Sequence, residues 1–209
     1  MARKQKLFVL FLMLTSHLHA QDTLCHYYNN GILKSKGVML QGKQQGLWEY
    51  YYPSGVLNAR LNYKEGVLHG RAEYFHENAR HAAIEQWEES WLHDSAWYFY
   101  PEGTLHRKGK YHKSRYEGIW VYFYPDGKTE RMISYRDGLP HGRFAHYHTN
   151  GNVSQEGSYE NGKEHGLWKF YDREGQLRYE GYYDNGIRTG TWYRYMKNGK
   201  KKITGSVRM

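Results

Sequence analysis

The sequence predicts an all-β protein, an elongated array of eight 24-residue antiparallel β-hairpin repeats in a single-sheet ribbon or solenoid, and three observations support this class. Aromatic residues make up 17% of the chain, with 22 tyrosines, and aromatic side chains favour strands. Its 23 glycines, against only 4 prolines, recur at regular intervals as turn residues do. Finally, the sequence repeats every 24 residues from residue 22 to residue 209 without an insertion or deletion.

The first twenty residues are predicted to be a signal peptide. Arg3, Lys4 and Lys6 precede an apolar run at 7–14, and a small residue, Ala20, stands before Gln21. The run is too short to span a bilayer. We therefore expect domains at 1–20 (signal peptide) and 21–209 (repeat domain), and a secreted or periplasmic protein. Without residues 1–20 the chain has 27 basic and 21 acidic residues and a net charge of +6.

The repeat frame predicts eight units, of which the last is shorter. They begin at Asp22, Gly46, Gly70, Asp94, Gly118, Gly142, Gly166 and Gly190. Because a single hairpin is not stable alone, neighbouring units must stack and share their apolar faces. Sixteen strands at about 4.8 Å would give a ribbon roughly 75 Å long.

Each unit is predicted to be strand, turn, strand, turn. The first strand covers about positions 2 to 7 of the unit and the second about 11 to 18. Glycine occupies the tenth position in every unit but one, where Ala79 stands, and the twenty-first position in five units, often after Asp or Asn. Both positions are typical of turns in which glycine adopts the left-handed conformation.

Large aromatic and apolar side chains define the predicted core. The sixth position is always aromatic, the third is Trp or Phe in five units, and the eighteenth is always large and apolar. The third and sixth positions lie on opposite faces of an extended strand. The predicted structural core is Trp48, Tyr51, Phe75, Phe99, Trp120, Phe123, Tyr147, Trp168, Tyr171, Trp192 and Tyr195.

Two parts of the array depart from the pattern. The unit at 70–93 has Ala72 and Ala79 in place of Trp and Gly, and a run of charge around Trp87. This predicts a decayed repeat, a kink, a short helical excursion or a functional departure. In the last strand, lysines at 200–202 would discourage pairing with other sheets.

The spacing G-x-W-x-x-Y-x-x-x-G, followed after about ten residues by G-x-x-x-G, resembles the MORN repeat variant. Good copies start at Gly46 and Gly166, as GLWEYY and GLWKFY. The resemblance covers essentially all of 22–209. The chain also resembles YwqK-type antitoxin proteins, which contain such repeats. It implies a stack of β-hairpins with a binding or scaffolding role and no known active site.

No catalytic or metal-binding motif is predicted. His76 and His81 are five residues apart, whereas a zincin helix needs four. The repeated His69, His93, His141 and His165 are one unit, or about 9–10 Å, apart at the closest, which is too far to share a zinc ion. Basic residues are spread among turns rather than grouped, so no nucleic-acid partner is expected. We expect no enzyme activity and no cofactor.

The predicted function is that of an exported protein-interaction or scaffolding module. The alternatives are a cell-envelope or carbohydrate-binding protein that uses aromatic rows, and an antitoxin- or immunity-like partner of a toxin. The seventh position of the unit varies most, so it is the candidate partner-binding row. It comprises Tyr52, His76, Tyr100, Tyr124, His148 and Asp172.

Overall fold

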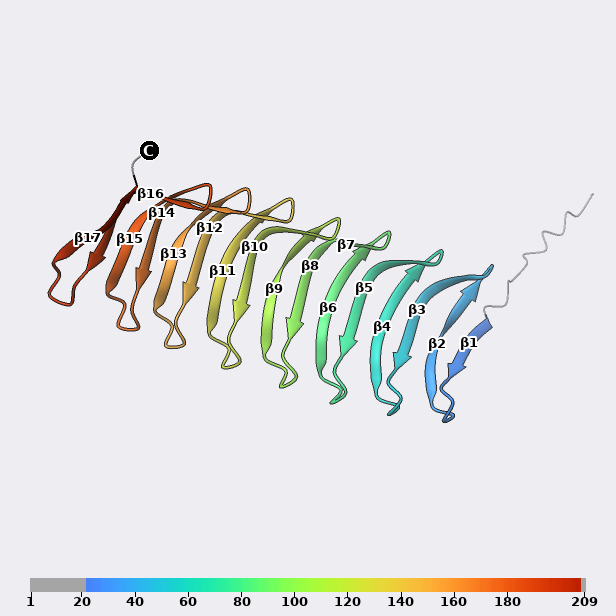
Figure 1. Ribbon diagram of the computed structural model, residues 1–209. Helices are drawn as coiled ribbons and strands as arrows, with labels where there is room; N and C mark the ends of the chain where they lie inside the picture. Colours follow the sequence, from blue (N-terminus) through green and yellow to red (C-terminus); the bar gives the residue numbers. More distant parts are fainter. Residues whose placement is uncertain (1–21, 208–209) are drawn as a thin grey trace, which may run out of the picture.

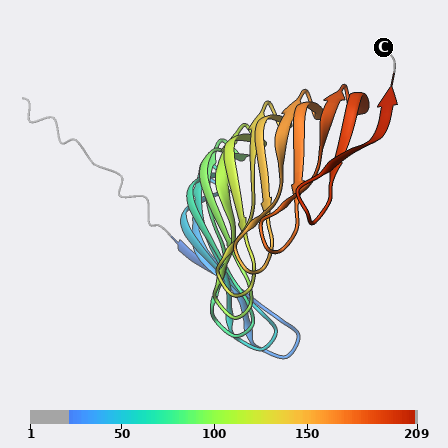
Figure 2. The same cartoon turned by 90° about the vertical axis from the view of Figure 1, so that its left-hand side faces the viewer.

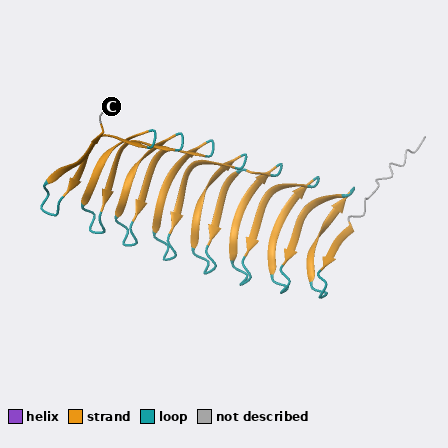
Figure 3. Cartoon of the chain, in the orientation of Figure 1, coloured by secondary structure: helices purple, strands orange, loops and turns teal. Residues whose placement is uncertain are grey.

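The computed structural model describes residues 22–207, and these form one open antiparallel β-sheet (Figure 1). No helix occurs among these residues, and strands alternate with short turns along the ribbon (Figure 3). The predicted signal peptide at 1–20 lies outside the described residues. The all-β prediction is confirmed, whereas the count of eight units stays a prediction.

The sheet has 17 strands, numbered in chain order. They are β1 (Asp22–Tyr27), β2 (Leu33–Leu40), β3 (Lys43–Tyr51), β4 (Leu57–Lys64), β5 (Val67–Phe75), β6 (His81–Glu88), β7 (Trp91–Leu92), β8 (Asp94–Phe99), β9 (Leu105–His112), β10 (Arg115–Phe123), β11 (Thr129–Arg136), β12 (Leu139–Tyr147), β13 (Val153–Glu160), β14 (Lys163–Tyr171), β15 (Leu177–Asp184), β16 (Ile187–Tyr195) and β17 (Lys201–Val207).

The strands follow one another as a meander, each antiparallel to the next along the chain. The exception is β6, which pairs with both β7 and β8 because these are one strand interrupted at His93. Seen from the β17 end, the strands are bent and their direction rotates gradually along the ribbon (Figure 2). Twist of this kind is the normal state of a large sheet.

Two rows of turns run along the two long edges of the ribbon (Figure 1). In the first turn the chain closes through a pair of backbone hydrogen bonds, as between Tyr52 and Val56 and between Gly55 and Tyr52. Ala79 takes the left-handed φ of +63° that glycine has in the other first turns. The second turn has two left-handed residues in succession, such as Asp137 and Gly138, which is the geometry of a tight hairpin turn.

The first strand is longer than predicted in the units that start at Gly46, Gly70, Gly118, Gly142, Gly166 and Gly190. For example, β3 begins at Lys43, three residues before the unit start at Gly46. Because the second turn has only two residues, backbone pairing resumes directly after it and continues across the unit boundary. Gly46 itself has a positive φ of +66°, and Asp94 at the same place in its unit has +60°. The strand bends there and pairing then continues.

The two faces of the sheet differ in burial. One face, here called the tryptophan face, holds most of the buried side chains; the described residues have no second layer to cover them. They bury one another instead, as Trp120 does with its ring 4.9 Å from Tyr111 and 4.5 Å from Tyr116. Trp120 is 0% exposed. The core is therefore a row of interlocking rings along one face.

The predicted core residues divide between the two faces. The four tryptophans Trp48, Trp120, Trp168 and Trp192 are buried on the tryptophan face. The sixth-position rings lie on the opposite, second face, where Phe75 is buried, Tyr27 is exposed and the others are half-buried. The sequence-based placement of the third and sixth positions on opposite faces agrees with this arrangement.

The unit at 70–93 keeps the strand structure throughout, so the short helical excursion considered for it was wrong. Ala72 at the third position is 1% exposed and lies beside Leu61 in the adjoining strand. Leu61 therefore faces a small residue at the position where four other units have a buried indole. The strand that follows this unit is interrupted at His93, between β7 and β8.

Candidate interaction surface

A continuous row of side chains crosses the second face from β2 to β16, one residue from each successive strand, with β8 supplying the residue for the interrupted strand. Each member is the antiparallel register partner of the next. The members of this axial row are Lys36, Glu49, Arg60, Glu73, Ile84, Trp97, Lys108, Val121, Met132, Ala145, Glu156, Lys169, Glu180 and Tyr193. Directly opposed side chains in a sheet lie within contact distance of one another.

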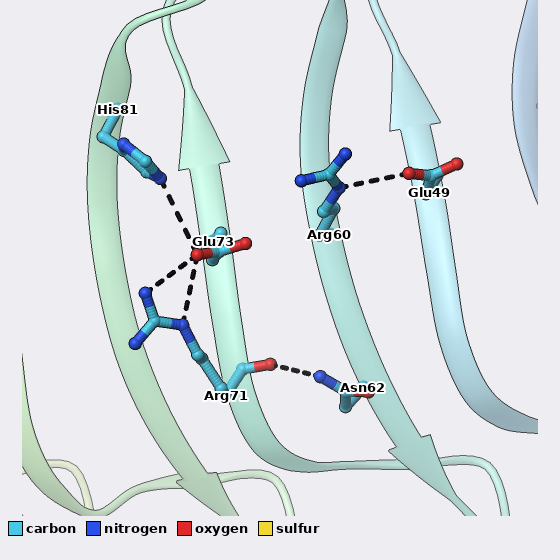
Figure 4. Close-up of polar contacts among 6 residues, drawn as sticks. All are labelled: Glu49, Arg60, Asn62, Arg71, Glu73 and His81. Atoms are coloured by element: carbon cyan, nitrogen blue, oxygen red, sulfur yellow. Dashed lines mark hydrogen bonds and ion pairs between the residues drawn. The ribbon is translucent and has the colours of Figure 1, made fainter.

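The first part of the axial row holds two groups of ion pairs, one around Glu49 and one around Glu73. Glu49 lies between Lys36 (Nζ–Oε2 2.9 Å) and Arg60 (Nε–Oε1 3.1 Å). Glu73 pairs with Arg71 at 2.8 Å and lies 3.7 Å from His81 (Figure 4). These contacts give the row an alternating sign along the ribbon axis.

The two carboxylates of this network titrate below their usual range. The hydrogen bond from Lys36, assisted by that from Arg60, lowers the pKa of Glu49. The hydrogen bond from Arg71 lowers the pKa of Glu73. Both carboxylates therefore stay ionised in mildly acidic solution, and the alternating pattern persists there.

The middle of the axial row is apolar apart from Lys108. Around Met132 and Ala145 the surface forms a groove of about 760 Å³ that is lined by Ile119, Tyr147, Glu156 and Leu167 as well. Ile119 is 57% exposed. Ala145 is the smallest member of the row, so its neighbours on either side stand above it. The arrangement is an apolar centre with charged ends, which is typical of protein interfaces.

The sixth-position aromatic rings pack beside the axial row. The hydroxyl of Tyr147 reaches the Met132 sulfur at 3.8 Å, and that of Tyr171 donates to Glu156 at 2.6 Å. Tyr195 donates to Glu180 in the same way. Burial, together with the bond to Glu156, raises the pKa of Tyr171. These rings fix the side chains of the row that they touch.

The seventh-position residues, predicted as the partner-binding row, join neighbouring units. Each aromatic or imidazole side chain in this row is half-buried and hydrogen bonds the backbone carbonyl of the sixth residue in the following unit. The pairs are Tyr52–Phe75 (2.8 Å), His76–Phe99 (3.2 Å), Tyr100–Phe123 (2.9 Å), Tyr124–Tyr147 (2.6 Å) and His148–Tyr171 (3.0 Å). Their polar atoms therefore hold consecutive hairpins together, and partner binding by this row stays a prediction.

Asp172 departs from this pattern. Its carboxylate accepts from the backbone N–H groups of Glu174 and Gln176 within its own turn and pairs with Arg178. The candidate row thus changes role at Asp172, from linking two units to closing one turn.

Sequence reasoning missed the axial row because it considered each unit separately. The row alternates between two positions of the repeat unit, the fourth on its first strand and the fifteenth on its second strand. Neither position has a constant residue type. The signal becomes visible only when both positions are aligned across successive units. It then shows alternating charge, an apolar centre and charge again.

The repeated histidines do not converge. His165 lies 3.5 Å from both Glu160 and Asp184, while His93 lies 3.6 Å from Glu88. No group of three metal-ligating side chains is found within residues 22–207. Over the same range, no helix has the length and apolarity that crossing a membrane requires.

The fold and this surface define a class, the open-sheet β-hairpin repeat protein. The family model of the MORN repeat variant matches the chain at residues 44–65, 116–137, 140–161 and 164–185. The chain therefore contains MORN-variant repeats at these four places. Such repeats generally mediate interactions with proteins or membranes, which fits a repeat protein module.

No curated protein matches the chain. Two solved structures share local similarity with it. A GtfA/B complex bound to UDP and GlcNAc is 13% identical, with a TM-score of 0.18, over 66% of this chain and 22% of that one. A TcdB2–TccC3–Cdc42 structure is 10% identical, with a TM-score of 0.21, over 87% of this chain and 14% of that one. The chain thus spans less than a quarter of either structure's length.

Proposed function

We propose that this protein is an exported, non-enzymatic interaction module whose protein partner lies along the axial row. The observation that carries the proposal is the unbroken register from Lys36 to Tyr193, with charged ends and an apolar centre. A row that crosses thirteen strand spacings of about 4.8 Å is roughly 60 Å long. A partner that uses all of it must itself be elongated.

The pattern of the row defines the partner's chemistry. The charges alternate from Lys36 to Glu73 and again from Glu156 to Glu180, so a complementary partner carries alternating charges of opposite sign at both ends. Its middle must be apolar to cover the groove at Met132. Charge complementarity of this kind selects the partner and its register more than it adds affinity.

The export part of the proposal is supported by the sequence pattern at 1–20. It is tested by expressing the full chain in the cells that produce it and measuring the intact mass of the protein outside the cytoplasm. A mature chain that begins at Gln21 is the expected result. An uncleaved chain retained in the cytoplasm would contradict export.

The interaction itself is tested by retention of envelope-fraction components on immobilised residues 21–209, with separate protein and glycan readouts. One stoichiometric protein partner is expected. Val121→Asp, in the apolar centre of the row, should reduce its retention about tenfold or more. The matched control is Ile187→Asp, which removes an apolar side chain that is 66% exposed and lies off the row.

Two outcomes would overturn the proposal, and a third would narrow it. Equal retention by the Val121→Asp and Ile187→Asp proteins would remove the axial row from the interface. Retention on polysaccharide without a protein partner would favour the carbohydrate-binding alternative. A toxin as the captured partner would keep the interaction and specify its class, as in the antitoxin-like alternative.

A further inference from the structure

Four glycines on the tryptophan face are each covered by a tryptophan of the following unit. A Cβ atom added to Gly37, Gly109, Gly157 or Gly181 would lie only 2.2–2.3 Å from the nearest ring atom of Trp48, Trp120, Trp168 or Trp192. Real contacts are never this short, so these four places accept only glycine. We call such a place, a sixteenth-position glycine beneath an indole, a tryptophan site.

The backbone completes each tryptophan site. The indole Nε1 donates a hydrogen bond to the carbonyl of the residue that follows the glycine. The four bonds are Trp48–Val38 (3.1 Å), Trp120–Lys110 (2.9 Å), Trp168–Ser158 (3.2 Å) and Trp192–Tyr182 (3.2 Å). A tryptophan site thus offers a flat surface and one acceptor, both on the same strand.

Gly205 in β17 is at the same position in its unit, but it carries no indole. A Cβ added there would meet no atom within 4 Å. Among residues 22–207, β17 pairs only with β16, so within this part of the chain its other side is unpaired. Gly205 is therefore a vacant tryptophan site beside unpaired backbone groups.

The vacant site opens into a groove of about 540 Å³, lined by Phe170, Tyr179, Trp192, Arg188 and Arg194. Arg188 lies over the Trp192 ring at 4.3 Å, and Arg194 lies 6.0 Å from the Tyr179 ring centre. Within the described residues neither guanidinium is within 4.0 Å of a carboxylate. The groove is thus aromatic and positively charged.

We propose that this edge binds an extended segment of a partner protein that contains a tryptophan next to acidic residues. The segment pairs with β17 as an additional antiparallel strand, and its indole lies on Gly205 and donates to the Ser206 carbonyl. Its carboxylates face Arg188 and Arg194. Main-chain pairing supplies affinity in this mode of recognition, and side-chain pockets supply specificity.

A second copy of this chain fits the edge less well. The strand that would continue the array is β1, and its third position is Leu24 rather than Trp. Leucine has neither the flat ring nor the N–H donor that the site accommodates. The lysines at 200–202 also oppose pairing with another basic chain.

This inference goes beyond the proposed function, because it concerns the tryptophan face and the β17 edge rather than the axial row. The probe is a fluorescently labelled peptide with the sequence of β3, KQQGLWEYY, with both glutamines replaced by glutamate (Gln44→Glu and Gln45→Glu). Its binding to residues 21–209 is measured by fluorescence polarisation. Replacement of the peptide's tryptophan (Trp48→Ala) should weaken binding about tenfold or more.

Two variants of the protein test the site itself. Gly205→Val fills the vacant site without disturbing existing contacts and should abolish binding. Arg188→Gln should weaken binding several-fold, whereas the exposed Arg173→Gln in a turn is the matched control and should have no effect. Val121→Asp, which tests the axial row, should also leave peptide binding unchanged, so the two proposals can fail separately.

The inference is overturned if the peptide with Trp48→Ala binds as well as its parent or if Gly205→Val binds normally. Sedimentation of the protein alone supplies the remaining outcome. A concentration-dependent polymer that Gly205→Val disrupts would assign the edge to a second copy and overturn the proposal of a different partner.

Discussion

The region from Gly157 to Trp192 and the region from Leu61 to Ala96 fill the same space on the tryptophan face with opposite residues. In the first, glycine in one strand faces an indole from the next unit. In the second, Leu61 faces Ala72. Glu85, one residue beyond the Ile84–Trp97 pair, comes beside Ala96 in the same way.

This difference teaches that the packing unit is a pair of residues from two neighbouring repeats. Leu61 and Glu85 stand where four other units have a sixteenth-position glycine beneath an indole, and the third position of the unit that follows each is alanine. Ala72, Glu85 and Ala96 are buried and Leu61 is half-buried. The pair Ile133 and Phe144 is a third type, in which both members are large and both are buried. The carboxylate of Glu85 is also satisfied, since Tyr98 Oη donates to it at 2.8 Å and Trp87 Nε1 at 3.1 Å. The unit at 70–93 is therefore compensated in its packing, which argues against simple decay.

The largest effect should come from removing an indole from its tryptophan site. Trp120→Ala removes the most buried ring in the core cluster and should cost about 3–5 kcal/mol of unfolding free energy. Leu61→Ala, in the compensated region, should cost about 2 kcal/mol because a smaller side chain is lost. Urea denaturation followed by circular dichroism measures both. Equal losses of unfolding free energy in the two variants would contradict the difference between the two regions.

Glycine substitutions should separate the occupied tryptophan sites from the vacant one. Gly109→Ala places a Cβ 2.3 Å from the Trp120 ring and should destabilise the protein by about 1–3 kcal/mol, the usual cost of overpacking. Gly205→Ala meets no atom within 4 Å and should leave the urea midpoint unchanged. A midpoint shift at Gly205 equal to that at Gly109 would contradict the vacancy.

Exchanging one type of pair for the other sharpens the comparison further. Glu85→Gly alone removes the acceptor for Tyr98 and Trp87 and should cost about 1–3 kcal/mol. Addition of Ala96→Trp should restore part of this loss, because it converts the pair to the glycine–indole type. A double-mutant cycle measures the coupling, expected at about 0.5–3 kcal/mol. Strict additivity would contradict pairwise compensation.

The smallest effect concerns pH and the charged end of the axial row. The pKa values of Glu49 and Glu73 are lowered in the folded protein. Their contribution to stability is therefore present above the unfolded pKa, near 4.5, and is lost as the pH falls through the lower, folded value. Solvent screening limits it to a few tenths of a kcal/mol.

Urea midpoints at pH 6 and pH 3 measure this contribution. The control is the double variant Glu49→Gln and Glu73→Gln, which should show a smaller pH dependence than the parent protein. An unchanged pH dependence in that variant would show that these ion pairs do not contribute.

Much of the fold could be predicted from the sequence, because the determinants are local. The glycines at the turns and the aromatic residues at the third and sixth positions directly predict a hairpin in each unit. The strand starts could not be placed in the same way, since residues such as Lys43 are paired only because the preceding turn is so short. Turn length, rather than the identity of Lys43, decides where pairing resumes.

The candidate surfaces were harder to predict because each depends on two units. The seventh-position residues vary in type, which suggested a binding row, but a tyrosine hydroxyl and a histidine nitrogen can make the same bond to a carbonyl. Tyr52 and His76 do so. Likewise, the sequence of one unit does not identify Gly109 as a core residue. Its importance depends on Trp120 in the following unit, whose ring covers it.

The division of each tryptophan site between two repeats also sets a rule for how such genes can gain or lose segments. Excision of residues 166–189 would place Trp192 over Gly157, which leaves room for the indole. Excision of residues 142–165 would instead place Trp168 over Ile133, whose side chain would clash with the indole. Duplication and deletion of 24-residue segments are therefore not equally tolerated along the chain, and the array can lengthen or shorten only where the residue left behind suits the residue that arrives.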